Sequence, residues 1–134
     1  MLVIFLFLAT LAFTGWVAFR DGGPSERQAV AAMASAFVLS LLLTNNMFVG
    51  PDVGILLVDA GLLSVFIMIA MRGDAFWPIW ATGMQAGLLL VHAAAAVLPH
   101  LRPVTYVETM TIWSFAVLSA VTLGCLIERR ELRR

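Results

Sequence analysis

The stretch VGILLVDAGLLSVFIMIAM, residues 53–71, decides the fold class of this chain. Pro51 precedes it, Arg72 follows it, and Asp59 is the one ionisable residue inside it. A helix needs about 20 apolar residues to cross about 30 Å of hydrocarbon, whereas a membrane strand needs about 10 residues that alternate in polarity. This stretch is long enough for a helix and does not alternate, so it predicts a transmembrane helix.

Four further apolar runs of similar length lie on either side of it. The five expected spans are 2–19, 28–48, 53–71, 76–98 and 109–127. Apolar residues make up 62% of the 134 residues and charged residues 12%, which is about half the charged fraction of a soluble domain. The sequence therefore predicts an all-α, polytopic membrane bundle of five transmembrane helices that forms one domain over the whole chain.

The prolines support the same boundaries. All five fall in the polar breaks or in the first turn of a run, at Pro24, Pro51, Pro78, Pro99 and Pro103. A proline inside a helix removes a hydrogen bond and clashes with the preceding turn. Backbone chemistry and hydropathy thus predict the same breaks.

The arginines predict the orientation, because cytoplasmic loops are enriched in basic residues. If the C-terminal tail is inside, then Arg20, Arg27 and Arg72 are inside as well, and Arg102 alone is outside. We therefore expect the N-terminus outside and the C-terminus inside. All eight basic residues are arginine and alanine is abundant, which favours a bacterial source and hence the inner (cytoplasmic) membrane of a bacterial cell.

Aromatic residues near the span ends predict interfacial belts, since amphipathic rings prefer the level of the lipid headgroups. Trp16, Trp77 and Trp80 are expected at the inner interface. Tyr106 and Trp113 are expected at the outer one.

Asp59 and His92 have matched expected depths. Asp59 lies six residues after Val53 and His92 six residues before Leu98, so each should lie about 9 Å from the same membrane face. The short connection between their spans makes these helices antiparallel neighbours. Because an ionisable group at a span centre costs roughly 2.5–3.5 kcal/mol, we expect the two side chains to pair. The pair would either bind a proton or act as a hydrogen-bonded staple between helices.

Other polar residues are expected near the same end of the bundle. Gln85 lies two helical turns from His92 on nearly the same stripe. Asn45, Asn46 and Glu108 fall at the outer ends of the second and fifth spans. Together with the pair they are the candidate proton- or ligand-binding residues, either lining a small polar pocket or lying apart. No catalytic residue and no metal ligand is assigned.

Small residues predict close helix packing. Gly83 and Gly87 form a GxxxG motif in the fourth span. Glycines four residues apart flatten one helix face, so that a neighbouring helix can approach closely. We expect this face to pack within the chain or against another subunit.

The sequence predicts no cofactor. Cys125 is the single cysteine, so it can form neither an internal disulfide nor a zinc cluster of thiols. The motifs of nucleotide-binding loops, zinc proteases, thiol redox sites and serine hydrolases do not occur. His92 and His100 are poorly placed to face each other across one haem, because His100 follows Pro99 outside its span. Haem with one axial histidine and a bound quinone stay open as alternatives.

Three functions agree with these observations, and the few polar groups in the spans and the small-residue faces favour the first of them. The first is an accessory or structural subunit of a larger membrane assembly, with the lipid bilayer and other subunits or further copies of the chain as partners. The second is a proton-coupled carrier or channel that uses Asp59 and His92. The third is an intramembrane protein that binds a lipid or quinone, with His92 as the base of any reaction; we expect no enzyme. The formal net charge is zero, and no basic stripe indicates nucleic acid.

Overall fold

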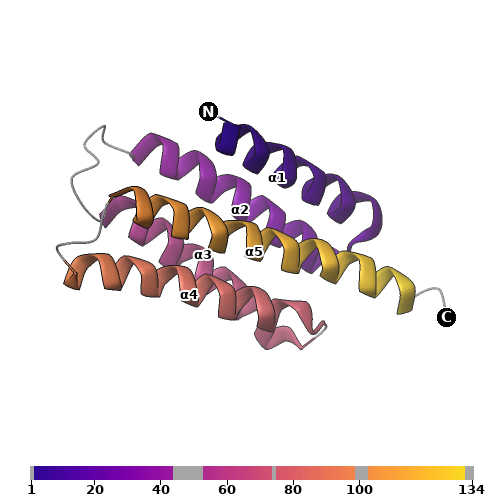
Figure 1. Cartoon of the computed structure of the whole chain (residues 1–134). Helices are drawn as coiled ribbons and strands as arrows, with labels where there is room; N and C mark the ends of the chain where they lie inside the picture. The colour runs from indigo at the N-terminus through magenta and orange to yellow at the C-terminus, as the bar shows by residue number, and fades with distance from the viewer. Residues whose placement is uncertain (1, 44–52, 74, 99–102, 132–134) are drawn as a thin grey trace.

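The structure is a computed structural model that describes residues 2–43, 53–73, 75–98 and 103–131, without the side chains of 103, 104, 107 and 128–131. Its helices are α1 (Leu2–Asp21), α2 (Pro24–Leu43), α3 (Val53–Arg72), α4 (Trp77–Val97) and α5 (Pro103–Glu131). Figure 1 shows them side by side along one axis, each running opposite to the helix before it. All five are long and apolar enough to cross a membrane. The predicted all-α, five-helix fold is thus confirmed.

Helix α5 is the centre of the packing. It contacts α1, α2 and α4, while α3 packs on α2 and α4. The core lies where these helices meet and includes Phe66, Leu118 and Val121, all fully buried. Many large apolar side chains point outward instead; Leu42 and Leu90, for example, are 76% and 70% exposed. Such a surface suits lipid better than water, which agrees with five membrane-spanning helices.

The second helix begins earlier than the hydropathy predicted. The expected polar break covered residues 20–27, but only Gly22 and Gly23 separate α1 from α2. A Cβ atom on Gly22 would lie 2.7 Å from the carbonyl oxygen of Ala18, so the turn needs a glycine. Pro24 then opens α2 at a position where a proline costs no hydrogen bond. The turn chemistry, rather than the charge of the segment, sets this boundary.

The fifth helix is also longer than its apolar run. The predicted span, 109–127, agrees with the membrane-length part of α5, Glu108–Ile127. The helix itself runs from Pro103 to Glu131, so it takes in six residues of the expected break and part of the expected tail. Hydropathy missed these turns because they contain threonine, tyrosine and charged residues. The predicted extension of the second span to Phe48 lies outside the described residues.

The residues of the predicted aromatic belts differ in exposure. Trp16 and Trp80 are more than half exposed, as residues at an interface would be. The prediction is wrong for Trp77, which is only 7% exposed. Trp113 is half-buried and lies against Gly87. These two rings have close neighbours in the bundle, and those contacts decide their position.

The GxxxG motif is divided between two environments. A Cβ on Gly87 would lie 2.7 Å from the Trp113 ring, so Gly87 lets α5 come close to α4. A Cβ on Gly83 would meet nothing within 4 Å. Only Gly87 therefore serves packing between the described helices.

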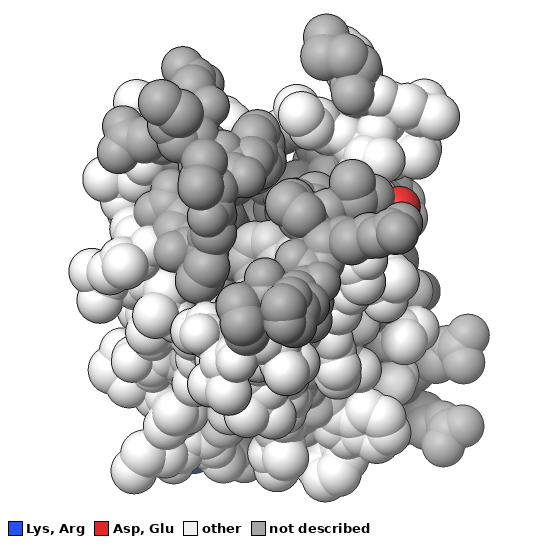
Figure 2. Space-filling model, turned by 60° about the vertical axis from the view of Figure 1, so that its left-hand side comes forward, with Lys and Arg blue, Asp and Glu red and all other residues white. Residues whose placement is uncertain are grey.

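The two ends of the bundle differ in charge. Arg20 and Arg72 lie in the last turns of α1 and α3, and Arg27 lies in the first turns of α2, so all three are at the end where the C-terminus lies. Figure 2 views the molecule from nearer the opposite end, where the described surface is almost entirely uncharged. The basic side chains of the described part are thus gathered at one end.

Candidate functional site

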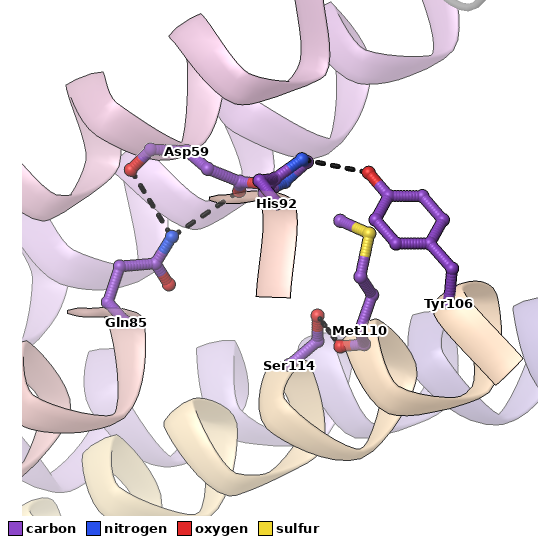
Figure 3. A network of polar contacts seen from close by, with 6 residues as sticks. All are labelled: Asp59, Gln85, His92, Tyr106, Met110 and Ser114. Atoms are coloured by element: carbon purple, nitrogen blue, oxygen red, sulfur yellow. Dashed lines mark hydrogen bonds and ion pairs between the residues drawn. The ribbon is translucent and has the colours of Figure 1, made fainter. Parts of the chain in front are cut away.

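Four polar side chains from three helices meet inside the bundle, near the end opposite the described arginines. They are Asp59 of α3, Gln85 and His92 of α4, and Tyr106 of α5, which we call the Asp–His–Tyr network (Figure 3). His92 and Gln85 are almost fully buried, with exposed fractions of 1% and 2%. Because α4 lies between α3 and α5, its two polar residues can reach both neighbours.

The central contact joins Asp59 and His92. His92 Nε2 lies 2.9 Å from Asp59 Oδ2, and the Asp59 side chain is 14% exposed. This is an ordinary hydrogen-bond length. The contact predicted from matched depth is therefore confirmed, whereas its role in binding a proton or ligand stays a prediction.

Tyr106 engages the other nitrogen of the same ring. Its hydroxyl oxygen lies 2.8 Å from His92 Nδ1, and the two rings meet edge to face. A neutral imidazole has one N–H donor and one acceptor nitrogen, and a protonated one has two donors. The tyrosine hydroxyl can donate to the first form and accept from the second. Both charge states of His92 thus keep a partner on each nitrogen.

Gln85 holds the aspartate from the side. Its Nε2 donates to the backbone carbonyl of Asp59 and to Asp59 Oδ1, both at 3.3 Å. These distances are longer than the usual 2.9–3.0 Å, so the two bonds are weaker than the central contact. Together they orient the carboxylate and leave Oδ2 for His92.

The arrangement can shift a proton without moving a heavy atom far. The carboxylate, the imidazole and the phenol form one continuous chain of two short contacts. In the neutral ring Nδ1 can take up a proton from the Tyr106 side while Nε2 gives its own proton to the Asp59 carboxylate, so one proton enters the ring as another leaves it. A chain of this kind is suited to binding and relaying protons.

The other candidate residues do not join this network. Glu108 is exposed, and none of the hydrogen bonds described for the chain links it to the four residues. Residues two apart in a helix point about 200° away from each other, so Glu108 faces away from the side that carries Tyr106. Asn45 and Asn46 lie outside the described residues. A pocket that includes all the candidates is thus not formed by the described part.

Sequence reasoning missed the contacts of two polar residues, half-buried Tyr106 and buried Glu26. Tyr106 was expected at the lipid interface, yet it completes the network. Pro103 was the available signal, because a proline that opens a helix would place Tyr106 one turn inside α5. Glu26 was expected in a polar break, yet it is 1% exposed. Its signal was its place three residues after Gly23, where a glutamate can cap a helix start.

A further polar contact lies between α1 and α5. The hydroxyls of Thr14 and Thr122 lie 2.8 Å apart. Each hydroxyl also lies within hydrogen-bond distance of a backbone carbonyl one turn earlier in its own helix. Hydroxyl pairs of this kind join membrane helices. This contact has no ionisable group, so we regard it as packing.

No protein family, no curated protein and no solved structure matches this chain. Within the described residues, no group of three histidine, cysteine or acidic side chains is placed to hold a metal ion. The fold and the site define the class in outline: a five-helix bundle suited to a membrane, with a partly buried carboxylate–imidazole–phenol network.

Proposed function

We propose that this chain is a small integral membrane protein that binds and relays protons at the Asp–His–Tyr network, as a proton-coupled carrier or channel. The sequence alone favoured a structural subunit. The observation that favours a proton-binding role over a structural one is the continuous contact from Asp59 through both ring nitrogens of His92 to Tyr106. Joining two helices needs one hydrogen bond, whereas these two contacts give each ring nitrogen of His92 a partner in either charge state.

The cost of placing these groups in a span also supports a function. Aspartate at the centre of a membrane helix costs roughly 2.5–3.5 kcal/mol on insertion scales. Hydrogen bonds between membrane helices return about 0.6 kcal/mol on average and about 1.7 kcal/mol at most. Asp59 lies nearer the start of α3 than its centre, so its cost is below the central figure, and the contact with His92 offsets part of it. Ionisable groups that persist at this depth commonly mark ion or proton pathways.

The orientation forms part of the proposal. The three described arginines lie at the end where the C-terminus lies, and the positive-inside rule puts that end in the cytoplasm. The Asp–His–Tyr network would then lie in the outer half of a bacterial inner membrane. A C-terminal reporter that is active only in the cytoplasm should be active on this chain, and activity of a reporter restricted to the exterior would reverse the assignment.

Proton flux is the test of the proposed function. In liposomes with a pH-sensitive dye inside, the wild-type chain should dissipate an imposed pH gradient faster than empty liposomes do. Asp59→Asn keeps the size and polarity of the side chain but removes its charge, so it should slow the flux by at least about tenfold. Glu108→Gln, which changes an exposed acid outside the network, is the matched control and should keep the wild-type rate. A wild-type rate equal to that of empty liposomes, with and without a membrane potential, would reject the proposal.

A second candidate is the accessory subunit, and the open glycines favour it. Gly61 and Gly83 would accept a Cβ without meeting any atom within 4 Å. An open glycine on a membrane helix permits close approach of another chain. Purification in mild detergent would then recover other membrane proteins at fixed stoichiometry, and recovery of this chain without them would count against that candidate.

A further inference from the structure

A second buried carboxylate lies at the opposite end of α4 from the Asp–His–Tyr network. Glu26, in the first turn of α2, is 1% exposed. The proposed function does not use it. Its burial needs an explanation, because an acidic side chain is almost never fully buried unless it is paired.

Both carboxylate oxygens of Glu26 accept a hydrogen bond. The backbone N–H of Gly23 donates to Oε2 at 2.8 Å. This is the return bond of a helix cap, in which a glutamate at the third helical position satisfies the N–H of the cap residue. The indole N–H of Trp77 donates to Oε1. Capping explains the first bond only, since the second reaches across to the first residue of α4.

Trp77 is held firmly in this position. Its ring is 7% exposed and lies directly on Gly124 of α5, where an added Cβ would be 2.3 Å from the ring. Trp77 thus connects α2, α4 and α5 at one point. We call Glu26, Trp77 and Gly124 the inner clasp.

The charged groups around the clasp make no described ion pair with Glu26. Arg27 of α2 donates to the Phe19 carbonyl at 3.2 Å. Arg72 of α3 donates to Gln28. Arg20 of α1 lies 3.9 Å from Asp21 and over the Trp16 ring. Helix α4 has no ionisable residue near this end, and the charged side chains of α5 at 128–131 are outside the described set. The described partners of the Glu26 carboxylate are therefore two neutral N–H groups.

We propose that Glu26 is a second proton-binding site, and that protonating it releases Trp77 and loosens the inner end of α4. The carboxylate takes one proton from hydronium, leaving water, and becomes a neutral acid; Trp77 keeps its own N–H. A hydrogen bond to an ionised acceptor is roughly twice as strong as a neutral one, so protonation weakens the contact with the indole. It also removes the cost of a buried charge that none of the described cations neutralises.

This site gives α4 a carboxylate partner near each end. Asp59 of α3 holds His92 and Gln85, and Glu26 of α2 holds Trp77. Proton uptake at Glu26 would free one end of this helix, whereas the Asp–His–Tyr network keeps His92 bonded at the other end in both of its charge states. The inference goes beyond the proposed function, because it concerns a different proton and requires none to cross the membrane.

The test uses Trp77 as a reporter of Glu26. The chain has four tryptophans, and replacing Trp16, Trp80 and Trp113 by Phe leaves Trp77 as the single one. In lipid nanodiscs, Trp77 emission should shift to longer wavelength and become more accessible to iodide as the pH falls from about 9 to about 4. Glu26→Gln in the same background should abolish this transition. Asp59→Asn should preserve it, which separates this site from the Asp–His–Tyr network.

Two results would overturn the inference: Trp77 emission that does not change with pH, or a transition that persists unchanged in Glu26→Gln. If a variant fails to fold, the unaltered chain still provides a test. The indole N–H resonance of Trp77 should lie downfield at high pH, where the carboxylate accepts its proton, and should move upfield on acidification. A resonance that stays fixed would reject the inference as well.

Discussion

Replacing Asp59 by Leu is expected to destabilise the bundle, and replacing Asp59 and His92 together is expected to cost less than the sum of the two single changes. Asp59→Leu leaves Nε2 of the buried His92 without its partner, whereas Nε2 of Gln85 keeps only its bond to the backbone carbonyl of residue 59. An unsatisfied buried polar group costs about 1–3 kcal/mol. The double variant removes both sides of the central contact, so part of that penalty disappears.

The cost of the double variant, compared with the sum of the two single costs, measures the coupling energy between the Asp59 and His92 side chains. Contacts between membrane helices have coupling energies of about 0.6 kcal/mol on average and about 1.7 kcal/mol at most. We expect the Asp59–His92 pair to lie in the upper half of this range, because one partner is a carboxylate. Unfolding in mixed detergent micelles of rising SDS content would give the four free energies of the cycle. Additivity within about 0.3 kcal/mol would show that the contact contributes nothing specific to the fold.

Gly124→Ala should destabilise the bundle more than Gly87→Ala does, and Gly83→Ala should have almost no effect. At Gly124 the new Cβ would lie 2.3 Å from the Trp77 Cγ atom and 2.6 Å from its Cβ, so the α4 backbone has to move. At Gly87 it would meet the outer edge of the Trp113 ring at 2.7 Å, and a rotation of that side chain can relieve part of the clash.

Overpacking of a close-packed interior costs about 1–3 kcal/mol, and we expect Gly124→Ala to reach the upper part of that range. Gly83→Ala is the matched control, because it lies in the same helix as Gly87 and meets nothing within 4 Å. The same SDS titration measures all three. Equal stability of the Gly124 and Gly83 variants would mean that Trp77 does not lie against α5.

Much of this fold could be predicted from the sequence, because hydropathy and proline act over short distances along the chain. The apolar run 53–71 agrees with α3, and Pro24 and Pro103 open their helices as a proline at a helix start should. Two of the errors fall where a polar residue is helical and bonded to another helix. Hydropathy treats the buried Glu26 and the half-buried Tyr106 as loop residues, since it takes no account of a hydrogen-bond partner on another helix.

In the candidate site, too, the features that depend on residue spacing could be predicted, and those that depend on helix packing could not. Depth along a helix depends only on residue number, so the meeting of Asp59 and His92 could be predicted. The choice of the third partner depends on which face of α5 turns toward α4. Tyr106 faces inward, and Glu108, two positions later, does not. That rotation is set by packing, such as the fit of Trp113 on Gly87, and not by any local signal.

The protonation of His92 tests the proposed proton site most directly. The chain has two histidines, so ¹⁵N labelling of histidine with His100→Gln as the assignment variant isolates the His92 ring in lipid nanodiscs. We predict hydrogen-bonded signals from both ring nitrogens, a change from one N–H to two as the pH falls, and an altered Nε2 signal in Asp59→Asn. A His92 ring that keeps one protonation state from about pH 9 to about pH 4, identically in wild type and Asp59→Asn, would contradict the proposal that the Asp–His–Tyr network binds protons.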